Sequence, residues 1–405
     1  MPSIMSEPIS STAASDPPEN RRLLAICALA LFATSLFMRA IDPVVPQIAG
    51  EFSLDVRTVA LLSTAYTLPY ALIQPVLGSF ADTLGKSLVL KVSLVTTAVA
   101  GLMGALAPDF SVLFASRIMT GVVSGGIFPI SLAIAGDLVP VSRRQIAFGH
   151  MLAASMLGNL LGSPLAGVIA DLVGWRGIFA VIGCFAFVVY VAVEIGFRGV
   201  FVERRGRFDL PTILAGYGAV MKNPLAKICF FTVFVEGAVV FGFFPYVAAL
   251  LAMRGEASAT IAGIVIAAFA VGGIVYSSSV SRLLNLVGER PMMAGGSLFM
   301  ATGLMVTAIG FSWPVDVVAF MVLGFGFYSM HGVVQIYATE LAPASRGLAM
   351  ALHSFCFFMG QAVGPVAYRY GIAGLGTVGA VALAGAGLVA VGVLCAATLR
   401  RTARA

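Results

Sequence analysis

The sequence predicts an all-α membrane protein whose twelve transmembrane helices form two related six-helix bundles. The 405 residues have a mean hydropathy of +1.01, with 60% hydrophobic and only 10% charged residues. Soluble proteins carry about a quarter charged residues. The chain also contains an internal repeat, because DLVPVSRR at 137–144 returns as ELAPASRG at 340–347. The composition therefore requires lipid as the solvent, and the repeat indicates a duplicated architecture.

Apolar runs long enough to cross a bilayer, for which a helix needs about 20 residues, recur along most of the chain. They form two sets of six separated by a polar gap. The sequence lacks the ten-residue segments of alternating hydrophobicity that are typical of barrel strands. The runs are therefore read as helices. The predicted spans are 22–49, 57–81, 88–107, 111–136, 146–171 and 177–198, then 227–252, 259–284, 291–311, 316–339, 347–371 and 377–399.

The distribution of lysine and arginine predicts that both termini are cytoplasmic. The inner side then holds Arg21, Arg22, Lys86, Lys91, Arg143, Arg144, Arg198, Arg204, Arg205, Arg207, Lys222, Lys227, Arg282, Arg290, Arg346, Arg400, Arg401 and Arg404. The outer side holds only Arg57, Arg176, Arg254 and Arg369. The net charge of +6 therefore sets the topology and does not imply a nucleic-acid partner.

The polar segments divide the chain into four parts. Residues 1–20 lack the basic start and apolar stretch of a signal peptide, so we expect a disordered cytoplasmic tail. The other predicted parts are an N-terminal bundle at 21–198, a basic cytoplasmic linker at 199–226 that is partly helical around 208–221, and a C-terminal bundle at 227–405. The five cysteines sit singly in apolar runs without metal or disulfide spacing and are read as small hydrophobic residues.

The loop GSFADTLGK (78–86) places Gly78, Asp82, Gly85 and Lys86 between spans 2 and 3. Taken with the twelve spans and their repeat, it resembles the loop motif of the major facilitator superfamily, although Thr83 and Ser87 replace basic residues of that motif. The resemblance implies that Asp82 locks one conformation by meeting the N-terminus of span 11. An anion near a helix start is stabilised by about 0.3–1 kcal/mol. A tight turn with an anchoring lysine is the structural alternative.

Span 4 contains RIMTGVVSGG (117–126), which is similar to the family's motif of Arg, two residues, Gln and Gly. Arg117 and Gly121 match, and Thr120 stands in place of Gln. An arginine inside a span costs roughly 2.5–3.5 kcal/mol on the insertion scale, so it should face the bundle interior and find a partner. The resemblance implies a part in proton coupling, and a structural ion pair is the alternative.

Span 5 contains GNLLGSPLAG (158–167), which resembles the glycine-spaced antiporter motif of the same family. The residues that carry the likeness are Gly149, Gly158, Gly162, Pro164 and Gly167. Small residues allow helices to approach closely, and a proline bends a helix and frees a carbonyl. The motif favours export over uptake, and plain close packing is the alternative.

Glu236 is the leading candidate for a functional acid. It lies nine residues beyond Lys227, so about 13 Å along a helix that rises 1.5 Å per residue. This depth is close to the midplane, where transporter sites lie. A carboxyl group there can exchange protons for a cationic substrate. A structural acid paired with an arginine or histidine is the alternative.

Arg39 and Asp42 are three residues apart in span 1 and therefore share one helix face. Pro43 and Pro46 follow and free helical carbonyl groups. A broken, charged helix suits a binding site or a gate. Asp42 lies twenty residues from Arg22, however, so a salt bridge at the outer helix end is an equal alternative.

The three histidines and several uncharged polar groups complete the candidates. Histidine titrates near neutral pH and suits a proton relay, which makes His331 in span 10 a coupling candidate, while His353 is placed in the cavity and His150 at the membrane interface. The full set of cavity candidates is Arg39, Tyr66, Tyr70, Gln74, Asn159, Tyr246, Gln335, Tyr337, His353, Phe357 and Gln361. For the uncharged polar residues a role in tying helices together is the alternative. For Phe357 the alternative is packing or lipid contact, and for His331 and His353 it is a hydrogen-bonded position in the core.

The sequence carries no recognisable enzyme or cofactor motif. The sequence has no phosphate-binding glycine loop followed by Lys and Ser or Thr, no zinc-ligand spacing and no nucleophile motif in a hydrolase context. We therefore expect no enzyme, no cofactor and no metal, and a proton gradient as the energy source.

The sequence-based prediction is a proton-coupled antiporter that exports a small drug-like molecule, sugar or metabolite by alternating access. Its partners would be substrate, protons and the lipid bilayer, and we expect a monomer in the bacterial inner membrane. One alternative is proton-coupled uptake of an organic anion held by Arg39 and Arg117, because arginine suits carboxylates. A non-transporting membrane sensor or scaffold is the alternative of another class.

Overall fold

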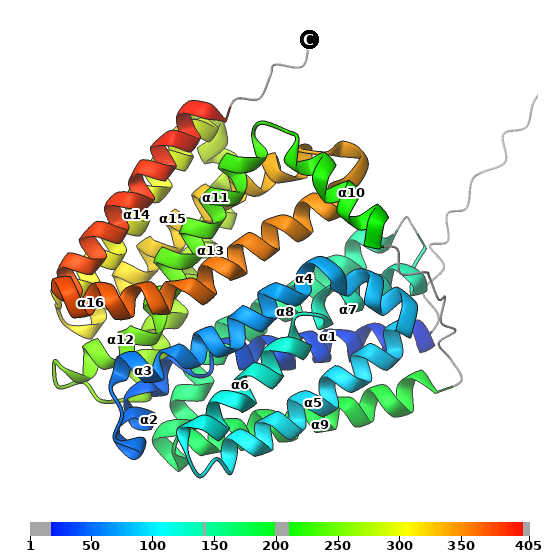
Figure 1. Cartoon of the computed structure of the whole chain (residues 1–405), viewed down its shortest axis with the longest axis horizontal. Coiled ribbons are helices and arrows are strands. Elements are labelled where there is room, and N and C mark those ends of the chain that lie inside the picture. The colour runs from blue at the N-terminus through cyan, green and yellow to red at the C-terminus, as the bar shows by residue number, and fades with distance from the viewer. Residues whose placement is uncertain (1–17, 141–142, 199–209, 400–405) are drawn as a thin grey trace, which may run out of the picture.

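The computed structural model describes residues 18–140, 143–198 and 210–399, without the side chains of 18, 76–82, 210, 213 and 344. All regular elements within these ranges are helical. Figure 1 shows two groups of helices side by side, one running from α1 to α9 and the other from α11 to α16. The tail predicted at 1–20 lies largely outside the described residues.

The first bundle contains a broken first span. Its elements are α1 (Pro18–Arg39), the 3-10 turn η1 (Asp42–Val44), α2 (Val45–Phe52), α3 (Val56–Val59), α4 (Leu61–Leu84), α5 (Lys86–Ala105), α6 (Phe110–Ser124), α7 (Ile127–Leu138), α8 (Arg144–Val173) and α9 (Trp175–Phe197). The break between α1 and α2 coincides with Pro43 and Pro46, which cannot donate helical hydrogen bonds. A second break separates α6 from α7 at Gly125 and Gly126.

The second bundle follows the short helix α10 (Leu210–Met221). Its elements are α11 (Ala226–Glu236), the π-helical segment η3 (Gly237–Phe241), α12 (Gly242–Ala252), α13 (Ala259–Leu286), α14 (Glu289–Ile309), α15 (Trp313–Glu340), the 3-10 turn η4 (Pro343–Ser345) and α16 (Arg346–Thr398). Gly376 has a φ of 70° and divides α16 into two helices. The eleven long apolar helices of the described chain therefore supply twelve spans, which confirms the predicted fold class.

The two ends of the molecule are named here by what they contain. The terminal face holds the starts of α1 and α8, the helix α10 and the end of α16, and the distal face holds α2, α3 and the start of α13 (Figure 1). The predicted helix around 208–221 is confirmed by α10, where the Tyr217 hydroxyl donates to the Pro75 carbonyl at 2.6 Å. Residues 199–209 of the predicted linker lie outside the described residues.

The repeat seen in the sequence is also visible in the backbone. Gly85 and Gly288, which the repeat aligns, have φ values of 101° and 78°. These conformations suit glycine, which has no Cβ to clash. Lys86 binds Asp137 at 2.7 Å, and Glu289 accepts a hydrogen bond from Tyr337 at 2.9 Å. Equivalent loops therefore fasten equivalent helix ends in both bundles.

Close helix packing in the second bundle depends on glycine. A Cβ at Gly324 would lie 1.9 Å from the Phe269 carbonyl oxygen, and one at Gly272 would lie 2.0 Å from that of Met321. Both α13 and α15 thus bring backbone against backbone, as small residues allow in membranes. Gly295 of α14, in contrast, has nothing within 4 Å of an added Cβ.

We expect Gly324→Ala to destabilise the protein by about 1–3 kcal/mol, because the methyl group would push α13 away from α15. Gly295→Ala is the matched control and should change stability by about 0.5 kcal/mol or less. The measurement is the temperature at which half of the purified protein loses its monodisperse peak in detergent. Equal midpoints for the two variants would contradict the packing described here.

Candidate functional site

The distal face is closed by contacts between the bundles. Asp171, near the end of α8, accepts hydrogen bonds from the Ser258 hydroxyl (2.8 Å) and from the amides of Ala259 (3.0 Å) and Thr260 (2.9 Å). These groups form the N-terminus of α13, where free amides and the helix dipole favour an anion. Asp171 therefore acts as a helix cap that joins one bundle to the other.

Glycine allows the same two helices to touch along their distal halves. A Cβ at Gly167 would lie 2.3 Å from the Ala259 carbonyl oxygen, and one at Gly263 would lie 2.5 Å from that of Ser163. Towards the terminal face the same helices expose Asn159, Ser277 and Ser278. In the part of the chain that the structure describes, the hydrogen bonds between α8 and α13 all lie at the distal end.

A cavity of about 230 Å³ lies midway between the faces and is lined by both bundles. The first bundle contributes α1, α4, α6, α7 and α8, and the second contributes α16. Its aromatic lining residues are Tyr66, Tyr70, Phe128 and Phe358. Its uncharged polar lining residues are Thr34, Ser35, Gln74, Ser124, Ser155, Asn159 and Ser354. Of the predicted cavity residues, Tyr66, Tyr70, Gln74 and Asn159 line this space.

Arg39 and Asp42 flank the break in the first span and are both buried. The Arg39 guanidinium lies 3.8 Å from the Asp42 carboxylate, donates to Gln361 Oε1 at 2.7 Å and stacks 4.4 Å from the centre of the Phe241 ring. Asp42 also accepts a hydrogen bond from Ser63 at 3.1 Å. The predicted pair therefore forms, and it binds the two bundles together near the distal face.

Arg117 points into the first bundle, as its burial cost requires. It donates to the Phe37 carbonyl at 3.2 Å, and its guanidinium lies 4.5 Å from the centre of the Tyr66 ring. Its Nη2 atom has no hydrogen-bond partner among the described residues. Arg117 thus lies behind the aromatic lining of the cavity without lining it.

Glu236 ends α11 at the π-helical segment, and its side chain is fully buried. His331 Nδ1 lies 2.8 Å from Glu236 Oε2, while Glu236 Oε1 has no partner among the described residues. The His353 ring lies 5.1 Å from that of His331. Segments of π-helix often mark functional sites. The predicted acid and the two predicted histidines therefore form one cluster, named here the Glu236 cluster.

Aromatic side chains surround the Glu236 cluster. The His331 ring stacks on Phe327 at 4.7 Å and meets Phe357 at 4.9 Å. Phe357 in turn contacts Phe358, which lines the cavity, at 5.3 Å. Consecutive residues of α16 thus connect the cluster to the cavity.

The remaining predicted cavity residues lie elsewhere. Tyr246 donates to the Pro365 carbonyl at 2.8 Å near the distal face, and Tyr337 binds Glu289 near the terminal face. Gln335 is exposed, and Gln361 is occupied by Arg39. The hydroxyl groups of Tyr246 and Tyr337 therefore tie helices or loops together.

The glycines of the antiporter-like motif have two packing roles. Gly158 and Gly162 bring α8 against α1, where added Cβ atoms would lie 2.6 Å from the Phe32 carbonyl oxygen and 2.9 Å from that of Leu36. Gly167 packs across the bundle interface, and Pro164 lies inside α8 between these contacts. Gly149 has nothing within 4 Å. The motif therefore spans both the core of the first bundle and the interface between the bundles.

The predicted gating loop is described only in part. The described part of the structure does not include the side chain of Asp82 or the surroundings of Gly78, so the contact expected between Asp82 and span 11 stays a prediction. Gly85 has a positive φ of 101°, and Lys86 forms an ion pair with Asp137 at 2.7 Å.

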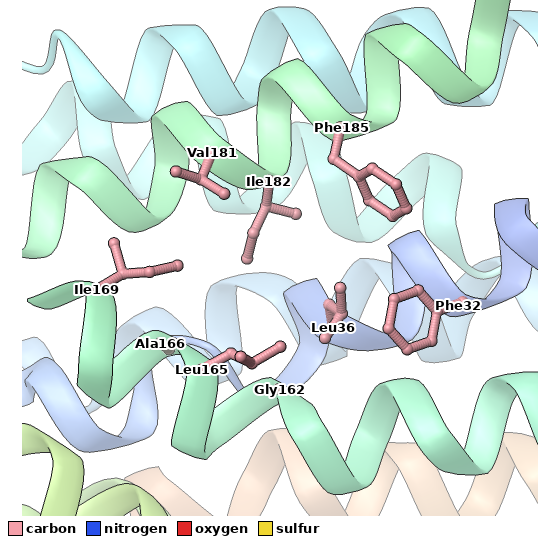
Figure 2. A pocket seen from close by; sticks show the side chains of 9 residues that line it. All are labelled: Phe32, Leu36, Gly162, Leu165, Ala166, Ile169, Val181, Ile182 and Phe185. Carbon is pink, nitrogen blue, oxygen red and sulfur yellow. The ribbon is translucent and has the colours of Figure 1, made fainter.

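A second cavity, of about 180 Å³, lies inside the first bundle between α1, α8 and α9. Figure 2 shows that its lining is apolar, with Phe32, Leu36 and Phe185 around one end and Ile169 and Val181 at the other. Apart from backbone it presents no hydrogen-bonding group that could orient a polar substrate.

Sequence reasoning did not single out the serines of the central cavity. Ser35, Ser124, Ser155 and Ser354 occur in apolar helices where serine is also common as a packing residue, so only their spatial convergence marks them. Among the described residues, no three His, Cys, Asp or Glu side chains gather as metal ligands.

The sequence matches the Major Facilitator Superfamily over residues 27–255 and 228–405, which together cover nearly all of it. The chain belongs to this family. A structure of a bacterial homolog of the human lysosomal transporter Spinster, inward-facing and unoccupied, superposes with a TM-score of 0.72 over 95% of this chain and 96% of that one, at 16% identity. That similarity shows a shared fold.

Two curated relatives share about a quarter of their residues with this transporter. The quinolone resistance protein NorA of Staphylococcus aureus is 24% identical, over 83% of this chain and 86% of that protein. A probable sugar efflux transporter of Mannheimia succiniciproducens is 24% identical, over 83% and 84%. The match to an uncharacterised transporter of Bacillus subtilis covers 62% of that protein's length.

We expect Asp171→Ala to loosen the distal closure, because the α13 amides would lose their acceptor. Loss of a helix cap costs about 0.5–2 kcal/mol, which corresponds to a rise in amide exchange of roughly twofold to thirtyfold. The measurement is hydrogen–deuterium exchange of a peptide covering 256–262. Asp109→Ala is the control, because Asp109 caps α6 within one bundle at 3.0 Å. Unchanged exchange in Asp171→Ala would contradict the role given to this cap.

Proposed function

We propose that this family member is a proton-coupled antiporter that exports small organic molecules by alternating access. The observation that carries the proposal is the arrangement of α16. Ser354 and Phe358 line the central cavity, while their neighbours His353 and Phe357 contact His331 of the Glu236 cluster. One helix therefore touches both the substrate space and His331, the partner of a buried acid that can exchange a proton.

Because Glu236 and His331 form a buried pair, a change in the protonation of either residue has a large energetic effect. A carboxylate without exposure is costly unless it is paired, and removing one partner of a buried pair costs about 3–5 kcal/mol. Gain or loss of a proton at Glu236 changes its interaction with His331, and His331 contacts α16 through Phe357. A shift of α16 would then alter the lining of the cavity.

Alternating access would use the contacts at the distal face. Two contacts join the bundles in the present state: Asp171 of α8 binds the start of α13, and Arg39 binds Gln361. Both must separate when that face opens. If the termini are cytoplasmic, as the lysine and arginine distribution predicts, the present state is inward-facing. In the outward-facing state Glu236 or Asp42 would take a proton, and in the inward-facing state the proton would leave as substrate binds.

Several further points belong to the same proposal. Arg117, behind Tyr66, would hold the cavity lining in place and influence the charge state of Asp42. Asp82 would lock the terminal face when it closes. The printed names of the two relatives, a quinolone resistance protein and a probable sugar efflux transporter, favour export. We place the transporter as a monomer in a bacterial inner membrane, with protons as the energy source and no cofactor.

Uptake of an organic anion receives less support. That function would need Arg39 and Arg117 as a clamp around a carboxylate. Arg39 instead binds Gln361 and Asp42, and Arg117 donates to backbone carbonyl groups. Neither arginine lines the central cavity.

We expect Glu236→Gln to abolish substrate-driven proton movement, because an amide cannot carry the proton. The assay uses proteoliposomes with an internal pH dye, an outside-acid gradient and a panel of sugars, amino acids, organic acids and lipophilic cations. The rate should fall to that of protein-free liposomes. Glu194→Gln is the control, because Glu194 pairs with Lys91 at 2.9 Å away from the cavity. Wild-type coupling in Glu236→Gln would remove this acid from the mechanism.

A further inference from the structure

The central cavity has a lining without formal charge. All of the residues around it are apolar, aromatic, hydroxyl-bearing or amide-bearing. We propose that this cavity selects uncharged organic molecules that combine a flat apolar face with a hydrogen-bonding edge. This inference rests on the proposed transport function and names its substrate class.

The charged side chains of the surrounding helices are turned away from this space. Arg39 is held by Gln361 and Asp42, Arg117 by backbone carbonyls, and Glu236 by His331. A charged ligand would leave water without meeting a counter-ion, which is costly in a space of low polarity. A cation would in addition face Arg117, whose guanidinium lies behind the Tyr66 ring.

Three aromatic rings provide a surface for a flat group. Tyr66 and Tyr70 stack with ring centres 5.9 Å apart and an interplanar angle of 24°. Phe358 approaches Tyr70 at 4.5 Å from the opposite bundle. Aromatic surfaces of this kind favour planar apolar ligands through stacking or edge contacts. Because the rings come from both bundles, a ligand lying on them would contact both.

Buried hydroxyl groups provide the polar edge. Tyr66 and Ser124 both line the cavity, and neither hydroxyl oxygen meets the distance and angle of a hydrogen bond within the described residues. Gln74 lines the same side and donates to the Gly125 carbonyl at 3.0 Å. Buried polar groups are normally satisfied, so unpaired ones in a cavity point to a ligand or water that satisfies them. The second, wholly apolar cavity lacks these groups and would not discriminate in this way.

The test compares three probes of one shape that differ in charge. They are an aryl glucoside, the matching aryl glucuronide with a carboxylate, and the matching aryl 2-amino-2-deoxyglucoside with an ammonium group. Binding to the purified full-length protein in nanodiscs is measured by calorimetry at pH 7 without a gradient. We expect the neutral glucoside to bind at least about tenfold more tightly than either charged probe.

A pair of serine variants localises the binding. Ser124→Ala should weaken glucoside binding by about threefold to tenfold, the effect of losing one neutral hydrogen bond. Ser131→Ala is the control, because Ser131 is also buried without a hydrogen-bond partner but does not line the cavity. Equal effects of the two variants would place the ligand elsewhere and overturn the proposal.

The remaining outcomes separate this inference from the proposed function. Tighter binding of a charged probe, or no binding of any of the three, overturns the proposed substrate class. Proton-coupled transport of a charged compound in the proteoliposome panel would overturn it too, while supporting the transport function. Selective binding of the neutral glucoside without substrate-driven proton movement supports the substrate class and contradicts coupling.

Discussion

The structure depends on keeping ionisable side chains paired inside a bilayer. Lipid offers no water to a buried charge, so each such group must find its partners within the protein. Arg39 pairs with Asp42 and Gln361, Arg117 with backbone carbonyls, and Glu236 with His331. Two of these three groups lie beside irregular backbone, at the break before η1 and at the π-helical segment η3. Irregular backbone within a membrane is tolerated where protein covers it, and here it places the buried polar groups.

The fold was accessible from the sequence because its causes are local. Apolar run length fixes the number of spans, the prolines at 43 and 46 mark the first break, and Gly85 with Gly288 marks the repeat. The helix α10 within the linker was predictable too. The break between α6 and α7 and the π-helical segment after Glu236 were not predicted, because glycine is common in membrane helices and a π-turn has no clear residue pattern.

The site was accessible only in part, for a different reason. Depth along a helix is encoded by sequence position, which is why Glu236 and His331 were found as mid-membrane candidates. The direction of a side chain depends on how the bundles meet, and no single span contains that information. Tyr246 and Tyr70 look alike in sequence, yet the first closes the distal face and the second lines the cavity. The unpaired hydroxyl of Ser124 becomes informative only once the cavity that it lines is known.

The position of α16 offers a link between the proposed proton exchange at Glu236 and the central cavity. Its glycines bring it against the backbone on both sides of Glu236: a Cβ at Gly360 would lie 2.0 Å from the Phe234 carbonyl oxygen, and one at Gly364 would lie 2.4 Å from that of Ala238. With backbone against backbone, α16 packs tightly on the end of α11 and on η3. The same helix reaches the other bundle through Phe358 on Tyr70 and Gln361 on Arg39. A change at Glu236 therefore has a short, tightly packed route to the surface where the bundles meet, and the cavity lies on that surface.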